Sequence, residues 1–186
     1  MKYLLGDAPP SLFDSSAYLE RAIITPSGQT IDLSSLSPLL RVLLSTDGTV
    51  TKSLEAIFWE PVQVRLVSQG NVQVARDINL FERNVQLVGL HSSVKYAYAR
   101  SFMNEAVMPS SLMEALHHGV HGVGWLLRQM SAEQYRAVVE IGYTHELPIN
   151  EQPKGFGESI YRTYCIVVGG QRLMQITEHF PLALFL

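Results

Sequence analysis

Apolar and polar positions alternate over much of this chain after residue 62, a pattern typical of β-strands with one buried face. The segments with this alternation are residues 62–67, 79–87, 94–102, 161–168 and 172–180. The last two flank Gly169–Gly170, which predicts a hairpin. A turn is expected at Gln69–Asn71, and residues 135–143 fit a helix or a strand equally well by period.

Helical spacing of apolar residues is found mainly before these strands. Residues 37–44 begin with a Ser-Pro pair, a typical helix start, and continue with leucines at helical spacing. A second helix is predicted over residues 51–59, and a third opens near Ser111, which forms a capping-box pattern with Glu114. Early helices followed by antiparallel strands with short turns predict an α+β fold built on a single antiparallel sheet.

Composition narrows the class of protein. With 186 residues, the whole chain, residues 1–186, is expected to form one domain. A formal net charge of -3 argues against a nucleic-acid partner. Neither a signal peptide nor a membrane span is indicated, and the single cysteine, Cys165, fits a reducing compartment, so we expect a cytoplasmic protein. Nothing in the sequence indicates an oligomeric state.

Two apparent motifs lack residues that their chemistry would require. Residues 119–124 contain three glycines, but the Lys-Ser/Thr of a phosphate loop does not follow them. Residues 117–121 contain three histidines, yet adjacent histidines on a helix cannot both face one ion, and no acidic ligand has a suitable spacing. We therefore expect neither a nucleotide site nor a metal site, and interpret the glycine-rich segment as a flexible link or flap.

Charged residues interrupt the apolar faces of three predicted strands. Glu178 has the same parity as Met174 and Ile176, so it is predicted to point into the core, where an unpaired carboxylate costs several kcal/mol. Arg83 and Arg100 likewise lie at alternate positions with apolar or aromatic neighbours, so each is predicted to share a strand face with them. One interpretation is structural: the arginines lie at an edge or face solvent, and Glu178 reflects a bulge, a register error or an ion pair with one of them. The other is a closed pocket where arginine binds a carboxylate and Glu178 handles a hydroxyl or a proton.

Several short segments together carry a family resemblance. They are residues 43–55, 62–70, 82–87, 98–102 and 170–181. In order and spacing, the chain from about Leu39 onward resembles the chorismate pyruvate-lyase family, particularly its cyanobacterial and plastid-type branch. Residues 1–36 are only weakly matched.

The resemblance implies both a fold and an activity. Members convert chorismate to 4-hydroxybenzoate and pyruvate without a metal or organic cofactor, on an antiparallel sheet whose ligand lies in an internal cavity under helical flaps. It implies that Arg83 is the ligand-binding arginine, that Glu178 is the pocket glutamate, and that Val123 and Val50 are the flap contacts. Arg100 is our candidate for the second carboxylate of chorismate, on strand parity alone.

The expected function is therefore that of a chorismate lyase, a carbon–oxygen lyase that supplies the ring of a plastoquinone- or ubiquinone-type quinone. Its expected partners are the substrate chorismate and the product 4-hydroxybenzoate. The alternative is a non-catalytic module that binds a small aromatic acid, since the same fold serves as an effector-sensing domain in transcription regulators. Against it, no helix-turn-helix segment is recognisable in the sequence.

Overall fold

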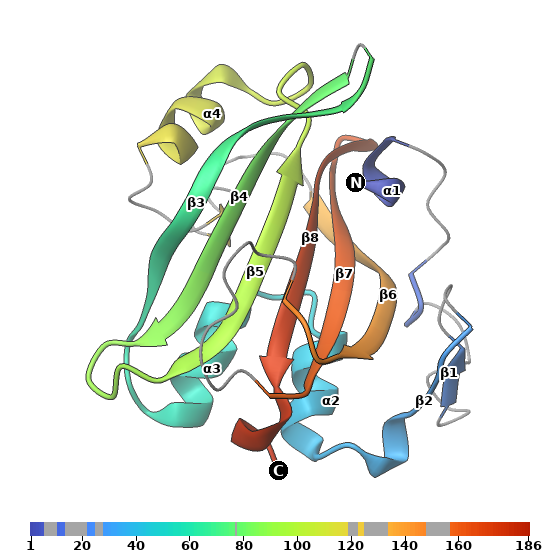
Figure 1. Cartoon of the computed structure of the whole chain (residues 1–186), viewed down its shortest axis with the longest axis vertical. Helices are drawn as coiled ribbons and strands as arrows, with labels where there is room; N and C mark the ends of the chain where they lie inside the picture. Colours follow the sequence, from blue (N-terminus) through green and yellow to red (C-terminus); the bar gives the residue numbers. More distant parts are fainter. Residues whose placement is uncertain are drawn as a thin grey trace.

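Six strands form one antiparallel sheet in the computed structural model, in the order β3–β4–β5–β8–β7–β6 (Figure 1). The strands are β3 (Val62–Ala75), β4 (Ile78–Gly89), β5 (Lys95–Met103), β6 (Gln134–Thr144), β7 (Ser159–Val168) and β8 (Gln171–Pro181). The structure describes residues 1–5, 11–13, 22–24, 28–76, 78–118, 123–124, 134–147 and 157–186. The predicted α+β fold on an antiparallel sheet is confirmed, and the ambiguous segment at residues 135–143 is a strand.

The remaining elements are short. They are α1 (Lys2–Leu5), the two-stranded sheet of β1 (Ala22–Ile24) and β2 (Thr30–Asp32), η2 (Leu33–Ser35), α2 (Pro38–Ser45), α3 (Val50–Phe58), α4 (Ser110–His117) and η3 (Leu182–Leu184). The predicted start of α2 is confirmed, because the Ser37 side chain accepts a hydrogen bond from the backbone N–H of Leu40. The hairpin of β7 and β8 is also confirmed, and both turn glycines, Gly169 and Gly170, have positive φ.

Two local predictions were wrong. Residues 69–71 are not a turn: β3 continues through them, paired with residues 81–83 of β4. The alternation breaks down there because the register shifts between Leu66 and Ser68. The capping box is also absent, since Pro109 occupies the N-cap of α4 without a side-chain hydrogen bond. The glycine-rich residues 119–122 lie outside the described residues.

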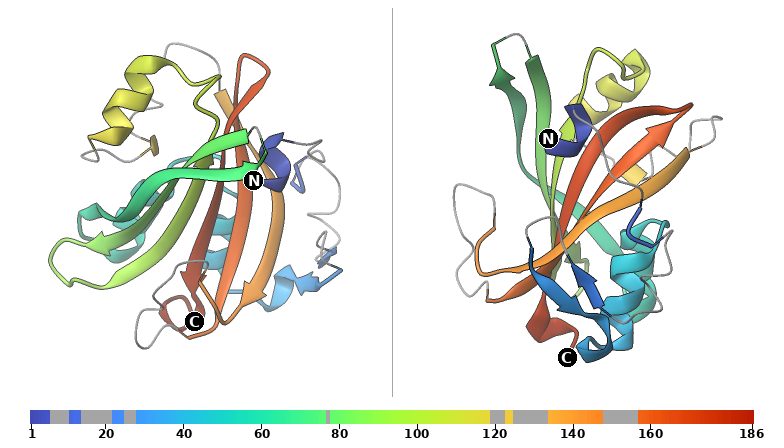
Figure 2. Two further views of the ribbon diagram at one scale, coloured as in Figure 1. Left: turned by 45° about the horizontal axis from the view of Figure 1, so that its top comes forward. Right: turned by 90° about the vertical axis from the view of Figure 1, so that its right-hand side faces the viewer.

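The hydrophobic core lies between one face of the sheet and the helices α2 and α3, which both views show on the same side (Figure 2). Leu40, Leu43 and Leu44 of α2 and Leu54 of α3 are almost completely buried, and Phe180 of β8 meets them from the sheet. Burying each leucine contributes about 2 kcal/mol. This packing fixes the segment between the two helices against the sheet.

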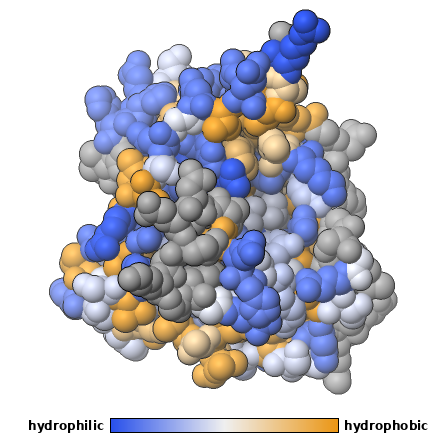
Figure 3. Space-filling model, in the orientation of Figure 1, coloured by the Kyte–Doolittle hydropathy of each residue, from blue (hydrophilic) through white to orange (hydrophobic). Residues whose placement is uncertain are grey.

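The opposite face of the sheet is more polar and is seen from outside in Figure 3, where small hydrophobic groups are separated by hydrophilic residues. At one end α1 covers it, because the backbone N–H of Tyr3 donates to Oε1 of Gln175 at 2.9 Å. His179 is buried on this face, and neither ring nitrogen has a hydrogen-bond partner among the residues the structure describes. Burial, and then the positive charge of Arg100, lower the pKa of His179 to about 4.

We predict a pH-dependent loss of stability from His179. Because its folded-state pKa of about 4 lies below the ordinary value of 6.5, the unfolded chain binds more protons between these values. The free energy of unfolding should therefore fall as the pH decreases from 6.5 towards 4, by about 3 kcal/mol for this group. Urea unfolding across this pH range measures the loss, and His179→Phe should flatten the profile. An equally steep profile in the variant would contradict the assignment.

Candidate functional site

A pocket of about 500 Å³ opens between the core-side face of the sheet and the first turn of α3. This volume is within the range of small-molecule sites. Its lining residues are Gly48, Thr49, Val50, Thr51, Lys52, Glu55, Val62, Gln63, Val64, Arg83, Val85, Leu87, Ala99, Ser101, Val123, Gly124, Arg136, Tyr164, Ile166, Ile176 and Glu178. Aliphatic side chains dominate the floor, and a few charged groups project from it.

Strand register explains why these side chains meet. Residues paired on neighbouring strands form rows that run across the sheet, and rows two positions apart along the strands point to the same face. Two such rows form the floor of the pocket. The first row is Arg83, Ser101, Ile176 and Tyr164, and the second is Val85, Ala99, Glu178 and Arg162. Every member except Arg162 lines the pocket. Arg83 and Glu178 therefore belong to one floor, although 95 positions separate their places in the numbering.

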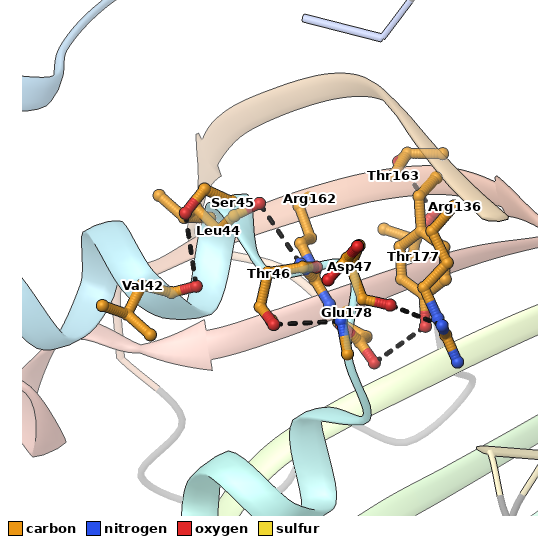
Figure 4. Close-up of polar contacts among 12 residues, drawn as sticks. Val42, Leu44, Ser45, Thr46, Asp47, Arg136, Arg162, Thr163, Thr177 and Glu178 are labelled. Carbon is orange, nitrogen blue, oxygen red and sulfur yellow. Dashed lines mark hydrogen bonds and ion pairs between the residues drawn. The ribbon is translucent and has the colours of Figure 1, made fainter. Parts of the chain in front are cut away.

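Glu178 is held by two neighbours on β7. Nε of Arg162 donates to one carboxylate oxygen, Oε2, at 2.9 Å (Figure 4). The hydroxyl of Tyr164 donates to the other, Oε1, at 3.0 Å. Both side chains of the ion pair are almost fully buried, at 1% exposed for Arg162 and 7% for Glu178. Glu178 thus forms an ion pair, as the structural interpretation predicted. Its partner is Arg162, however, and not Arg83 or Arg100.

Arg162 also fixes the segment that leads into the pocket wall. Its Nη1 donates to the backbone oxygen of Leu44 at 3.2 Å and to that of Thr46 at 2.6 Å. These carbonyls lie at the end of α2, where the helix leaves acceptors without intrahelical partners. One guanidinium therefore connects Glu178 to the chain just before residues 48–52, which form the wall opposite the floor (Figure 4).

The environment sets the ionic states of two further pocket residues. Burial first, and then the negative charge of Glu178, raise the pKa of the Tyr164 hydroxyl, so Tyr164 is a neutral hydrogen-bond donor. Burial lowers the pKa of Arg83 from its ordinary value, but a guanidinium remains charged at neutral pH. A cation on an apolar floor is suited to binding an anionic group with little competition from water.

Four of the five residues singled out from the sequence lie in the pocket. Arg83, Glu178, Val50 and Val123 all line it, and all four are buried. Arg100 does not line it. It pairs with Asn84 and Thr177, one position away from both rows of the floor, and therefore faces the opposite side of the sheet.

The structure thus contradicts the expected placement of Arg100. Its Nε lies 2.6 Å from Oε1 of Glu82, and the side chain packs on the ring of Phe102. The expectation failed because it compared Arg100 only with neighbours on its own strand, and Phe102 is itself half-buried on the far side. Parity within one strand does not identify which face of the sheet carries the pocket.

Sequence reasoning missed Arg162, Tyr164 and Arg136. The first two had a usable signal, because they alternate with Ile160 and Ile166 along β7 as Glu178 does along β8. Arg136 had none, since its segment fitted helix and strand equally well. Among the described residues, no group of three or more His, Cys, Asp or Glu side chains could hold a metal ion. No helix in the described part of the chain is long and apolar enough to cross a membrane.

Comparison with known proteins assigns the chain to a family. The model of the family described as "Chorismate pyruvate-lyase Rv2949c-like" matches residues 44–185, which include the whole six-stranded sheet. The chain belongs to this family. The resemblance to chorismate pyruvate-lyases is therefore confirmed, and the family is one of carbon–oxygen lyases.

The curated relatives are mycobacterial. A chorismate pyruvate-lyase of Mycobacterium leprae is 24% identical over 159 residues, covering 78% of this chain and 75% of that protein. One of Mycobacterium tuberculosis is also 24% identical, over 162 residues, covering 78% of this chain and 81% of that protein. These matches support the family rather than the cyanobacterial and plastid-type branch expected from the sequence.

Solved structures show weaker likeness. A GntR-family transcriptional regulator from Bacillus cereus has a TM-score of 0.48 and 9% identity, covering 67% of this chain and 94% of that one. The effector-binding domain of the Bacillus subtilis trehalose repressor has a TM-score of 0.41 and 6% identity, covering 67% and 93%.

We predict strong energetic coupling between Arg162 and Glu178. Arg162→Met should lower the free energy of unfolding by about 3–5 kcal/mol, because it leaves a buried carboxylate without its cation. Adding Glu178→Leu should recover much of this loss, since the second change removes the unpaired charge. Urea unfolding of both single variants and the double variant completes the cycle. Additive losses in the double variant would show that the pair is not coupled.

Proposed function

We propose that this protein converts chorismate to 4-hydroxybenzoate and pyruvate. The observation that carries the proposal is the shared pocket floor, where a buried arginine and a buried, oriented carboxylate face the same space in a member of a chorismate lyase family. These are the two groups that a hydroxylated aromatic acid requires, one for the carboxylate and one for the hydroxyl.

The chemistry is an elimination that makes a ring aromatic. Chorismate carries a ring carboxylate, a ring hydroxyl and, on the carbon next to the hydroxyl, an enolpyruvyl ether. The carbon–oxygen bond of the ether breaks on the ring side, and the hydroxyl-bearing carbon loses its hydrogen as a proton. The ring becomes 4-hydroxybenzoate, and enolpyruvate gains a proton to become pyruvate. Because aromatisation drives the step, the protein mainly has to orient the substrate and manage the proton.

Arg83 is the proposed ligand of the ring carboxylate. Its planar fork can hold both carboxylate oxygens and so fixes the direction in which the ring lies. The side chain is 1% exposed on β4, and aliphatic residues such as Val85 and Leu87 surround it on the floor. The apolar surroundings strengthen the contact with the carboxylate, since few water molecules compete for it.

Glu178 is the proposed partner of the ring hydroxyl. Its two oxygens accept from Arg162 and Tyr164, but each carboxylate oxygen can accept more than one hydrogen bond. Arg162 and Tyr164 both donate to it, so Glu178 already acts as a hydrogen-bond acceptor at this position. In the proposed complex it also accepts from the ring hydroxyl, whose oxygen becomes the phenol oxygen of the product, and takes up the proton that the ring loses.

The wall opposite the floor supplies the proposed flap contacts. Val50 begins α3, and the first N–H groups of a helix have no intrahelical acceptor. Val123 lies at the pocket with 9% of its surface exposed. Backbone contacts from these two positions and an apolar side-chain seal would exclude water from the reacting ring.

Purified protein should release pyruvate from chorismate and form 4-hydroxybenzoate in equal amount. Coupled lactate dehydrogenase measures the pyruvate, and chromatography measures the aromatic product. No pyruvate at micromolar enzyme would refute the lyase assignment. Tight 4-hydroxybenzoate binding without turnover would favour the alternative, a binding module for an aromatic acid.

Changes at the two proposed site residues should separate binding from turnover. Arg83→Ala should raise KM about 100-fold, because it removes the charged contacts to the ring carboxylate. Glu178→Gln should lower kcat by about 100-fold or more, because the amide cannot take up a proton. Steady-state kinetics with chorismate checks both effects.

Arg65→Ala is the matched control, since Arg65 is exposed on β3 and does not line the pocket. Thermal unfolding of each variant distinguishes a lost contact from a lost fold. Wild-type kinetics in a folded Arg83 or Glu178 variant would remove that residue from the mechanism.

The proposal extends to the use of the product. 4-Hydroxybenzoate is a phenolic ring that can be elaborated into a quinone, and the family resemblance supports a role before such a step.

A further inference from the structure

Three positively charged side chains among the described residues line the pocket: Arg83, Lys52 and Arg136. Lys52 is neutralised near the surface, because its Nζ lies 2.6 Å from Oε2 of Glu55 and its side chain is 63% exposed. Arg136 differs from Lys52. It comes from β6, and no carboxylate of the described residues lies within 4.0 Å of its guanidinium.

Arg136 approaches the floor from the side opposite Arg83. In the sheet order, β4 lies two strands from β8 on one side and β6 lies two strands from β8 on the other. Neighbouring strands are about 4.8 Å apart, so each arginine starts about 10 Å across the sheet from the strand of Glu178. A ligand centred over Glu178 therefore has one guanidinium on each side, that of Arg83 and that of Arg136.

A hydrogen bond and an electrostatic effect place the Arg136 side chain at this end of the pocket. Its Nη1 donates to the backbone oxygen of Asp47, just before the wall formed by residues 48–52 (Figure 4). Its positive charge also acts on Tyr164, where it opposes the rise in pKa caused by burial and by Glu178. Arg136 is thus near the Tyr164–Glu178 pair as well as the first turn of α3.

The hydrogen bond to Asp47 leaves most of the guanidinium available for a ligand. Arginine has five N–H donors in a planar fork, and one bond to a carbonyl uses only one of them. The bond also restricts the rotamer, so less freedom is lost when an anion binds. The first turn of α3 adds the positive end of a helix dipole to the same region.

Chorismate and its aromatic product differ by one carboxylate, the group that the guanidinium of Arg136 is suited to bind. Chorismate has a second carboxylate on the enolpyruvyl ether, whereas 4-hydroxybenzoate has only the ring carboxylate. We propose that Arg136 binds the enolpyruvyl carboxylate of chorismate and so selects the dicarboxylate substrate over its monocarboxylate product. This inference rests on the proposed function and assigns to Arg136 the role first expected of Arg100.

The assignment has a consequence for the order of events. With both ends of the substrate held by arginines, the ether lies between them and over Glu178. After the ether bond breaks, the carboxylate held by Arg136 belongs to pyruvate, and the carboxylate held by Arg83 belongs to the aromatic product. The two products then have separate anchors, so either can leave without the other.

The test compares chorismate with 4-hydroxybenzoate in wild-type protein, Arg136→Gln and Arg136→Lys. In Arg136→Gln, kcat/KM for chorismate should fall about 10- to 100-fold, because charged hydrogen bonds to one carboxylate are lost. The Kd for 4-hydroxybenzoate, measured by calorimetry, should change less than about threefold, since this ligand lacks the second carboxylate. Arg136→Lys should recover part of the kcat/KM, because the charge is restored without the fork.

Unchanged kcat/KM in a folded Arg136→Gln variant would overturn the assignment. An equal loss of chorismate turnover and 4-hydroxybenzoate affinity would also overturn it, because that result indicates a general disturbance of the pocket. If wild-type protein does not turn over chorismate, the proposed function fails. The same comparison of chorismate and 4-hydroxybenzoate affinities by calorimetry then still decides the role of Arg136.

Discussion

The buried ion pair between Arg162 and Glu178 is the interaction on which the site depends. Removing two charges from water costs several kcal/mol per ion, and further hydrogen bonds to both partners offset part of this cost. Tyr164 supplies one for the carboxylate, and the carbonyls at the end of α2 supply two acceptors for the guanidinium. The pair thereby orients Glu178 and joins the sheet to the segment that covers it.

Register decides which charges meet at this site and which do not. A residue shifted by one position along a strand points to the other face, so small differences in position have large chemical effects. Arg83 lies in a row with Ser101 and Tyr164, whereas Arg100, one position from that row, is paired with Glu82 on the far side. The floor of the pocket is therefore a property of the assembled sheet rather than of any one strand.

Sequence patterns predicted the helices and strands better than they predicted which residues would be neighbours in space. The inward direction of Glu178 followed from alternation along β8, because residue period is a local property. Its partner Arg162 could not be chosen over other arginines without the pairing of β7 with β8. The turn expected at Gln69–Asn71 failed for a different reason: a bulged edge strand with two exposed faces loses the alternation that marks a strand. The strand pattern linked Glu178 with either Arg83 or Arg100, and only the family resemblance assigned the ligand-binding role to Arg83.

The β7–β8 hairpin also has a consequence for folding. Arg162 and Glu178 are only 16 positions apart, so a tight turn brings the two charges together at a small cost in loop-closure entropy. The α2 carbonyls that complete the arrangement are 116 and 118 positions away from Arg162. The charges can thus pair while water still surrounds them, and their full dehydration requires that α2 has docked. The polar centre of the pocket is local in the chain, whereas its enclosure depends on long-range contacts.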